Sequence, residues 1–458
     1  TATVRGGPEQ ATLARVEPGD SCGDKFALGI DVGTTTIVAE LIDLNTGEAV
    51  GRGSAYNAQV SCGADVISRM VFASKGDGLT KLQELAAKTV NGVLESVFTK
   101  TGVDPGYVSH VVCAANTVMT HMFLGIDTKN IREAPHAPGA NVYPWVRAGE
   151  LGLDLVRDAY LTFYPCIAGY VGGDVVAGVL ASGMAERESL SLLIDIGTNG
   201  EIVLGNSDWM ISAATSAGPA FEGGGVKYGM RAARGAIDGV RIDAATKEPV
   251  IVTIGGVKPV GICGSGLVDL LAELFLSGVV DLKGKFNTGL STERLRDGKD
   301  GPEYVLVWAD RTAQGNDIAI TQPDVDNLIR AKAAVFAGIK LLSENTGVSV
   351  ADIDRVYIAG AFGNYLEVDK VVTIGLLPEI PSERFEFIGN GSLIGAELYA
   401  FSSKAKGEAE ALAEKITYLE LSTDPNFMNE YVSAMFLPHT EGGLFPSVAG
   451  ALRERAGL

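Results

Sequence analysis

The residues best placed for chemistry form one short pattern that occurs twice in this chain. Each copy is an apolar strand that ends in Asp, then a Gly followed by hydroxyl or amide residues, then a second apolar run. The members are Asp31, Gly33, Thr34 and Thr35 in the first copy, and Asp195, Gly197, Thr198 and Asn199 in the second. Two strand–turn–strand hairpins of this type indicate a duplicated fold with a phosphate site between its halves.

Each part of the pattern has a physical reason. Gly33 and Gly197 allow a tight turn in which no side chain blocks a ligand. Successive N–H groups in such a turn attract phosphate oxygens, and hydroxyl and amide groups add donors. A carboxylate repels phosphate unless a cation lies between them, so we expect Asp31 and Asp195 to hold Mg²⁺ through its waters. The alternative is an ordinary hairpin with an Asx-turn, which the repetition makes less favourable.

Composition limits the classes of protein and partner. The chain has 458 residues, of which 46% are hydrophobic and 20% charged, and this size allows two or three domains with a large core. The net charge of −19 argues against nucleic acid and anionic membranes as partners. No apolar run has the length of a membrane span, and no signal peptide is visible. We therefore expect a cytoplasmic protein, with residues 1–23 as the remnant of a linker.

The order of expected elements favours an α/β fold with mixed sheets covered by helices. We expect strands and helices to alternate in two similar halves. The expected strands are 26–32, 36–43, 48–57, 108–115, 190–196, 200–206, 208–214 and 416–421, and 355–364 is expected to be a strand that runs into a Gly-rich turn. The expected helices are 64–72, 81–100, 168–183, 264–276, 324–346, 391–401, 404–414 and 426–436. The small residues of 168–183 suit a helix that packs closely on another backbone.

At this point the chain resembles the superfamily of acetate and sugar kinases, heat-shock proteins and actin. Besides the two hairpins, the string IAGAFG at 358–363 is similar to the adenosine segment, and 170–182 and 391–401 are similar to the two connecting helices. The resemblance implies a duplicated actin-like (ribonuclease H-like) two-domain ATPase fold with a nucleotide cleft between the halves. We expect residues 24–180 and 391–458 to form the first domain and 181–390 the second, with the adenosine segment.

Within that superfamily the chain resembles the ATP-dependent reductive activators of corrinoid proteins, which serve corrinoid iron–sulfur proteins and methyltransferase or O-demethylase systems. The strings that carry this resemblance are PCIAGYVGGD (165–174), SAGPAFEG (216–223), GICGSG (261–266) and YVSAMFLPH (431–439). Such activators carry an N-terminal ferredoxin-like domain with a two-iron, two-sulfur cluster, whose closely spaced cysteines this sequence lacks. The resemblance thus implies an electron donor acting through a missing domain, and a possible homodimer.

The resemblance also implies roles for further residues. Gly360, Ala361, Phe362 and Gly363 would let adenine lie against bare backbone. Asp174 is either a catalytic base, beside Asp31 and Asp195, or an acid that favours a helix N-terminus. Gly264 and Ser265 either receive ribose or phosphate at a helix N-terminus, or form an ordinary N-cap.

The stretch 212–239 is the most distinctive loop. Its Ser216, Glu222 and Gly223 are candidate contacts with a protein partner, and the alternative is a solvated loop. The cysteines Cys113, Cys166 and Cys263 are interpreted as core residues rather than ligands of a shared iron–sulfur cluster.

The leading hypothesis is an ATPase that uses ATP and Mg²⁺ to drive the reduction of a corrinoid protein from Co(II) to Co(I). The alternative is a small-molecule kinase for a sugar or carboxylate, against which no obvious cluster of sugar-binding residues follows the first hairpin. A nucleotide switch similar to actin or a chaperone is the third possibility, although no separate peptide-binding domain is evident.

Overall fold

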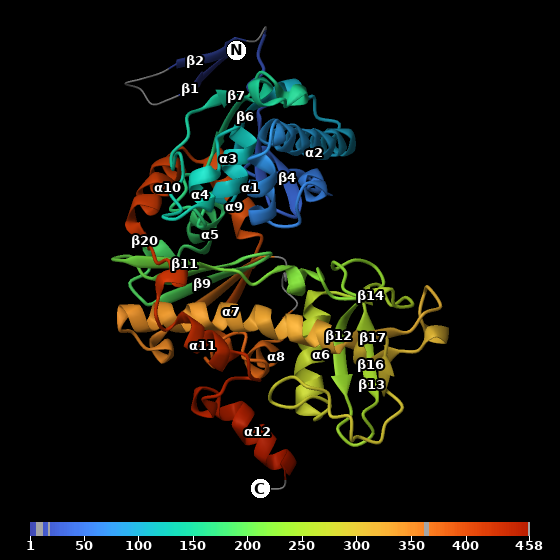
Figure 1. Ribbon diagram of the computed structural model, residues 1–458. Coiled ribbons are helices and arrows are strands. Elements are labelled where there is room, and N and C mark those ends of the chain that lie inside the picture. Colours follow the sequence, from blue (N-terminus) through green and yellow to red (C-terminus); the bar gives the residue numbers. More distant parts are fainter. Residues whose placement is uncertain (6–11, 17–18, 361–365, 457–458) are drawn as a thin grey trace. The chain divides into compact units, whose positions relative to one another are not determined.

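The computed structural model describes residues 1–5, 12–16, 19–360 and 366–456. The chain divides into two compact units (Figure 1). The first contains Thr1–Ala185 and Gly391–Tyr418, and the second contains Glu186–Asn390 and Leu419–Leu458. Each unit has its own buried hydrophobic cluster.

The first unit is built on a mixed sheet in the order β5-β4-β3-β6-β8-β7. Its strands are β3 (Phe26–Val32), β4 (Thr36–Asp43), β5 (Ala49–Tyr56), β6 (Val108–Ala114), β7 (Val146–Arg147) and β8 (Tyr160–Phe163). Its helices are α1 (Val66–Ala73), α2 (Gly78–Thr101), α3 (Thr117–Leu124), α4 (Lys129–Arg132), α5 (Gly173–Ser182), α9 (Gly391–Phe401) and α10 (Ser403–Lys415). A two-stranded hairpin, β1 (Ala2–Arg5) and β2 (Thr12–Val16), lies within the segment expected to be a linker.

The register of this sheet shows which helix covers which face. Gly29 of β3 pairs with Glu40 of β4, which pairs with Arg52 of β5. A Cβ at Gly29 would lie 3.2 Å from the backbone nitrogen of Glu397, so this face carries α9. Side chains alternate along a strand, so Gly53 points to the other face, where its Cβ would lie 2.9 Å from Val97 of α2.

Small residues set the approach of α5 to α9, as the sequence predicted. The Cβ that Gly395 of α9 lacks would overlap the backbone oxygen of Ala177 of α5. Helix α5 begins at Gly173 rather than at residue 168, because the preceding residues make a turn in which the Ile167 and Ala168 N–H groups both donate to the Val171 carbonyl. Helix α9 spans the predicted residues.

The second unit repeats the theme with the strand order β19-β18-β9-β10-β11. These strands are β9 (Ser191–Ile196), β10 (Gly200–Gly205), β11 (Met210–Thr215), β18 (Arg355–Gly360) and β19 (Phe385–Gly389). The unit's helices are α6 (Gly264–Leu276), α7 (Gln322–Thr346), α8 (Val368–Thr373), α11 (Phe427–Ala434) and α12 (Pro446–Ala456). Figure 1 shows α7 as a long helix along this sheet, and a Cβ at Gly200 of β10 would lie 3.1 Å from its Val335.

Two further sheets of this unit were not predicted. They are formed by β12 (Ala236–Ile242), β13 (Pro249–Thr253) and β14 (Gly261–Ile262), and by β15 (Leu295–Gly298), β16 (Gly301–Val307) and β17 (Ile318–Thr321). Strands β16 and β17 are buried almost throughout and β12 does not alternate regularly, so the sequence gives only a weak period-two signal. Because β12 begins at Ala236, the stretch 212–239 is not a continuous loop.

The domain boundary at the C-terminus corrects the prediction. Residues 419–458 group with the second unit, whereas we expected them in the first. The reason is packing on α7: Lys340 Nζ lies 2.8 Å from Glu430 Oε2 of α11, and the ring centroids of Phe336 and Phe445 are 5.3 Å apart. The short strand β20 (Ile416–Tyr418) is the last element before the chain enters the second unit.

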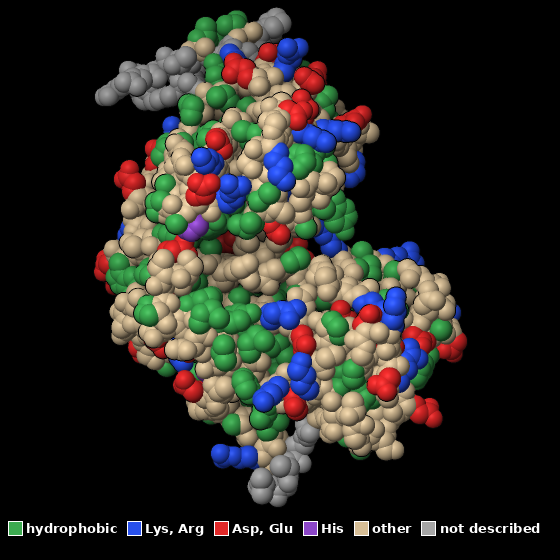
Figure 2. Space-filling model, viewed as in Figure 1, with side chains coloured by type: hydrophobic (Ala, Val, Ile, Leu, Met, Phe, Trp, Pro, Cys, Tyr) green, Lys and Arg blue, Asp and Glu red, His purple; other side chains and the backbone are tan. Residues whose placement is uncertain are grey.

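The surface carries charges of both signs. Figure 2 shows acidic and basic side chains mixed across the visible face of each unit, with no large basic area on it. None of the helices in the described part of the chain is both long enough and apolar enough to span a bilayer.

Candidate nucleotide site

The first hairpin joins β3 to β4 with the predicted geometry. Asp31 pairs with Val38 in the antiparallel ladder, which leaves Gly33 in the turn. A Cβ at Gly33 would lie 2.5 Å from the backbone oxygen of Thr36. No side chain larger than hydrogen fits there, so the tight turn requires glycine at this position.

Asn57 and Arg69 donate hydrogen bonds to the three carbonyl oxygens of this turn. Asn57 Nδ2 donates to the Gly33 oxygen over 3.0 Å, and Arg69 Nη2 donates to the Thr34 oxygen over 2.7 Å. The backbone N–H of Asn57 donates to the Thr35 oxygen over 2.9 Å. In a trans peptide the C=O and the following N–H point in opposite directions, so the N–H groups of Thr34 and Thr35 point away from these donors. Successive N–H groups that point to one side are the arrangement that an anion-binding nest requires.

Asn116 fixes the side chain of the same turn. Its Oδ1 accepts from the Met119 N–H at the start of α3, and its Nδ2 donates to Thr34 Oγ1 over 3.1 Å. The amide thus occupies an acceptor position of the hydroxyl and leaves the hydroxyl hydrogen as a donor. Asn116 therefore links the N-terminus of a helix to the orientation of Thr34.

The first unit brings two of the predicted carboxylates into one electrostatic environment. Ser392 Oγ of α9 donates to Asp31 Oδ1 over 3.1 Å. Asp174 lies in the first turn of α5, where the Val175 N–H donates to its Oδ1 over 2.9 Å. Burial is the main cause that raises the pKa of Asp174 to about 7, and the negative charge of Asp31 contributes to that rise, while the Val175 N–H opposes it. Asp174 can therefore exchange a proton near neutral pH, as a base requires, while it also occupies the helix N-terminus.

The second hairpin joins β9 to β10 and has different surroundings. Asp195 pairs with Glu201, and the Gly197 N–H donates to the Asn199 oxygen over 2.9 Å. Thr198 Oγ1 donates to Glu222 Oε1 over 3.1 Å, and burial raises the pKa of Glu222. A carboxylate, rather than a cation, therefore contacts this turn.

Gly360, the last described residue of the predicted adenosine segment, lies beside the strand of the second hairpin. Strand β18 runs parallel to β9, so that Ala359 pairs with Asp195 and Gly360 with Ile196. Gly360 has φ +101°, and a Cβ there would lie 2.6 Å from Asp195 Oδ1. Only glycine is compatible with both the conformation and the space. The remaining residues of this prediction, Ala361, Phe362 and Gly363, lie outside the described residues.

The predicted residues of α6 occupy a packed helix N-terminus. Cys263 is the N-cap, and its Sγ donates to the Ile237 oxygen over 3.2 Å. Ser265 is buried, with its Oγ 3.4 Å from Cys263 Sγ. These contacts leave both expectations for Gly264 and Ser265 open, a ligand contact and an ordinary cap.

The candidate partner contacts differ in exposure. Ser216 is exposed, Glu222 is half-buried against Thr198, and Gly223 is buried. A Cβ at Gly223 would lie 2.5 Å from the Met230 nitrogen. Of the three, Ser216 is therefore the one whose side chain a partner protein could reach directly.

The described side chains are compatible with Mg²⁺ but not with an iron–sulfur cluster. Among the described residues, no group of three or more His, Cys, Asp or Glu side chains could hold a metal ion. Mg²⁺ tolerates such a site, because it keeps several waters and takes its other ligands from substrate phosphates. An iron–sulfur cluster needs several thiolates, and it does not fit the described residues. Cys113 and Cys166 are buried, and burial raises the pKa of both thiols.

The contacts of four residues around the hairpin were not foreseen from the sequence: Asn57, Arg69, Asn116 and Ser392. Asn116 follows a strand and precedes a helix, which is a readable N-cap signal. Arg69 shares a helix face with Val66 and Met70, so a charged residue at an apolar position was also a readable signal. Nothing in the local sequence distinguishes Asn57 or Ser392.

Two family models match nearly the whole chain. The model described as the C-terminal domain of RACo, the ASKHA domain, matches residues 189–449. The model described as the RACo middle region matches residues 26–187. The boundary between the two matches lies close to the boundary between the two units.

Individual relatives agree with these matches. The corrinoid activation enzyme RamQ of Eubacterium limosum is 36% identical over 89% of this chain and 69% of its own length. The [Co(II) methylated amine-specific corrinoid protein] reductase of Methanosarcina barkeri is 25% identical over 89% of this chain and 76% of its length. A solved structure of a reductive activator for a corrinoid, iron–sulfur protein superposes with a TM-score of 0.92 at 45% identity, over 97% of this chain and 71% of that one.

Proposed function

The chain belongs to the RACo family, with the actin-like ASKHA fold, and from that premise we propose that it is the ATPase of a reductive activator. Its substrate would be a corrinoid protein in the inactive Co(II) state, which is returned to Co(I). The observation that carries the proposal is the pair of phosphate hairpins, each with an Asp on its strand, in a chain that resembles corrinoid activators over nearly its whole length.

The proposed roles follow from the geometry of each unit. The N–H groups of the first hairpin, with Thr34 and Thr35, bind phosphate oxygens of ATP, and Gly197, Thr198 and Asn199 do so at the second. Asp31 and Asp195 hold Mg²⁺ through water, and the ion supplies charge neutralisation on the phosphates. Hydrolysis then needs positioning and charge stabilisation rather than covalent chemistry from the protein.

Asp174 is the proposed base. Its pKa of about 7 means that the carboxylate can take a proton from the attacking water at neutral pH. The products are ADP and inorganic phosphate, and the proton passes to the Asp174 carboxylate. The helix N-terminus that Asp174 occupies stabilises the charged form of the side chain before the transfer.

The reduction itself is a one-electron step at the partner's cobalt. The electron comes from a low-potential donor, which we expect to act through a ferredoxin-like domain with a two-iron, two-sulfur cluster. ATP binding and hydrolysis would be coupled to this step through affinity for the corrinoid protein, with Ser216, Glu222 and Gly223 as candidate contacts. A homodimer and a cytoplasmic location remain predictions of the same kind. The kinase alternative is not favoured, because the matched relatives are named for action on corrinoid proteins.

The deciding experiment measures Mg²⁺-dependent ATP hydrolysis and nucleotide-dependent binding with a purified Co(II) corrinoid protein. We expect ATP to change the affinity for the Co(II) form, and the Co(II) form to change the rate of hydrolysis. The same corrinoid protein in its methylated Co(III) state is the matched control. Indifference of both quantities to the cobalt state would overturn the activator, because a ligand with no differential affinity shifts no equilibrium.

A further inference from the structure

Arg69 is the largest fully buried side chain of the described residues, and it carries a charge. It lies on α1, which begins at a capping box formed by Asp65 and Ser68. The inner face of α1 carries Val66, Arg69 and Met70, all of them buried. The helix thus directs a cation into the first unit at a position where its pattern calls for an apolar residue.

The Arg69 guanidinium contacts only neutral groups. Nε donates to the Gly63 oxygen over 2.9 Å, and Nη2 to the Thr34 oxygen over 2.7 Å. Nη1 donates to Gln59 Oε1 over 3.0 Å and to Met119 Sδ over 3.3 Å. In the described part of the chain, no carboxylate oxygen lies within ion-pair distance of Arg69. Burial lowers the pKa of Arg69 to about 10, so the group keeps its charge at neutral pH.

The nearest negative charge that acts on Arg69 is the exposed Asp65 at the N-cap of α1, which raises the pKa of Arg69 without forming an ion pair with it. A buried charge with no ion-paired counter-charge is unfavourable unless further groups compensate for it. The dipoles of two carbonyl groups compensate in part, and one of them is the carbonyl of Thr34 in the phosphate hairpin. The bond to that oxygen also fixes the plane of the peptide between Thr34 and Thr35. The Thr35 N–H must then point to the side opposite Arg69. The absence of an ion-paired carboxylate among the described residues and the orientation of the turn point to the same ligand, an anion held by the hairpin.

We propose that Arg69 is a positioning residue for ATP: it orients the Thr34–Thr35 peptide toward phosphate and supplies positive charge behind the turn. The inference rests on the proposed function, since it takes the nucleotide as the anion. It adds to that function a residue in the interior of the first unit, on a helix that the hairpin motif does not include. Phosphate affinity would then depend on α1 as well as on the hairpin itself.

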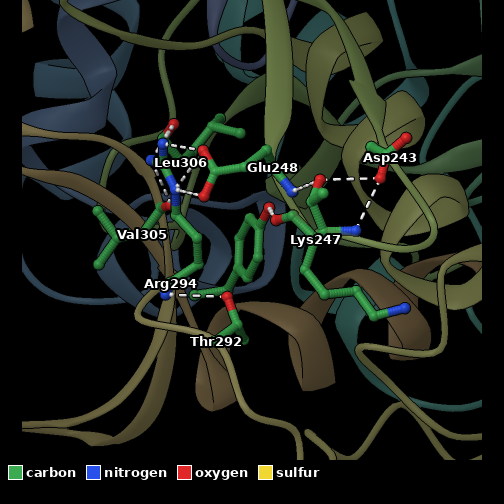
Figure 3. Close-up of polar contacts among 9 residues, drawn as sticks. Asp243, Lys247, Glu248, Thr292, Arg294, Val305 and Leu306 are labelled. Carbon is green, nitrogen blue, oxygen red and sulfur yellow. Dashed lines mark hydrogen bonds and ion pairs between the residues drawn. The ribbon is translucent and has the colours of Figure 1, made fainter.

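Arg294 of the second unit is the matched control. It is also buried, but it forms an ion pair in which Nη2 lies 2.6 Å from Glu248 Oε2. In Figure 3 its side chain points to Glu248 and to the backbone oxygens of Val305 and Leu306, each 3.3 Å from Nη1. These contacts join the two small sheets of that unit. Loss of Arg294 therefore costs stability without a change at the first hairpin.

The experiment compares binding of ATP and of adenosine to the wild type, Arg69→Met, Arg69→Lys and Arg294→Met by calorimetry, with Tm recorded for each variant. For Arg69→Met we expect the Kd of ATP to rise about tenfold or more, with the Kd of adenosine nearly unchanged, because the lost contact acts on phosphate. Arg69→Lys keeps the positive charge but loses the planar set of guanidinium donors, and it should raise the Kd of ATP by an intermediate factor. Arg294→Met should lower the Tm and leave both constants unchanged.

The outcomes separate the two proposals. Wild-type protein that binds no ATP would overturn the proposed function and the role of Arg69 with it. Wild-type protein that binds ATP, with the same preference for ATP over adenosine in the Arg69 variants, would overturn the role of Arg69 alone. If Arg69→Met does not fold, Arg69→Lys decides the question in the same way, since it keeps the buried charge.

Discussion

The two hairpins share a backbone plan but differ in what supports them. In the first unit, Asn57 and Arg69 donate to the carbonyl oxygens of the turn, and a cation lies behind it. In the second unit, a carboxyl group accepts from the turn, because Thr198 donates to Glu222. The same strand–turn–strand unit is therefore placed next to charges of opposite sign.

The two copies of the motif have the same backbone turn but different electrostatic surroundings. The antiparallel ladder and the glycine define the turn, since they act through the backbone. The surrounding helices and loops decide the electrostatics, because their side chains approach from distant parts of the chain. We therefore expect the first hairpin to contribute mainly phosphate affinity and the second mainly the arrangement of the reacting groups.

The largest effect is expected from the aspartate that each hairpin carries on its first strand, Asp31 or Asp195. Asp31→Asn and Asp195→Asn should each lower the rate of ATP hydrolysis about 100-fold or more, because each removes charge that holds Mg²⁺. Phosphate release at saturating Mg²⁺ measures this. The comparison fails if one variant keeps wild-type activity, since the two hairpins would then not both hold the ion.

The next largest effect is expected at the glycine of each turn, where the same substitution should change the Kd of ATP differently in the two hairpins. A Cβ at Gly33 would lie 2.5 Å from the backbone oxygen of Thr36, whereas one at Gly197 would lie 3.3 Å from Glu222 Oε1, the end of a side chain. Gly33→Ala must move backbone and should raise the Kd of ATP about tenfold. Gly197→Ala needs only a shift of Glu222 and should change it little. Calorimetry with a non-hydrolysable ATP analogue measures both, and equal Kd values would refute the distinction.

The pH dependence of hydrolysis tests the base in the first unit. A carboxyl group with a pKa of about 7 is mostly protonated at pH 6 and mostly ionised at pH 8. The rate should therefore rise about tenfold across that interval and level off above it. Asp174→Asn should lower the rate and remove this dependence. A profile that stays unchanged in the variant would exclude Asp174 as the base.

The same group affects stability with the opposite sign. Because the folded pKa of Asp174 lies above its ordinary value of 3.8, the folded state holds the proton more tightly than the unfolded state. The contribution is favourable at low pH and is lost as pH rises from about 4 through about 7. Asp174→Asn should therefore have a higher Tm than the wild type at pH 8, and a smaller advantage at pH 5.

The smallest effect is expected at Glu222. Glu222→Gln keeps an oxygen that can accept from Thr198 but removes a negative charge beside the second turn. At pH 8 we expect the Kd of ATP to fall about threefold, opposite in sign to the change expected for Arg69→Met. Titration at low and high salt measures it, because the change should shrink as salt screens the charge. A weaker affinity would show that Glu222 does not oppose the phosphates.

Local periodicity was sufficient for most strands of the two main sheets and most helices, but β7, β8 and β19 were not predicted. Helices α6 and α9 begin and end at the predicted residues, and β3 and β4 do as well. Strands β12 to β17 were missed, because β16 and β17 are buried almost throughout and β12 does not alternate regularly, which leaves little period-two signal. The last 40 residues were placed in the wrong domain, since their packing on α7 depends on contacts far apart in the sequence.

The sequence by itself determined the family, the two hairpins and their aspartates, because these depend on the order of a few residues along one strand and its turn. Only the tertiary structure decided what surrounds each turn. Arg69 and Ser392 are 35 and 361 residues away from the groups they contact, and no local pattern encodes such a distance. The raised pKa of Asp174 has the same origin, since its burial and its proximity to the charge of Asp31 arise only when the chain is folded.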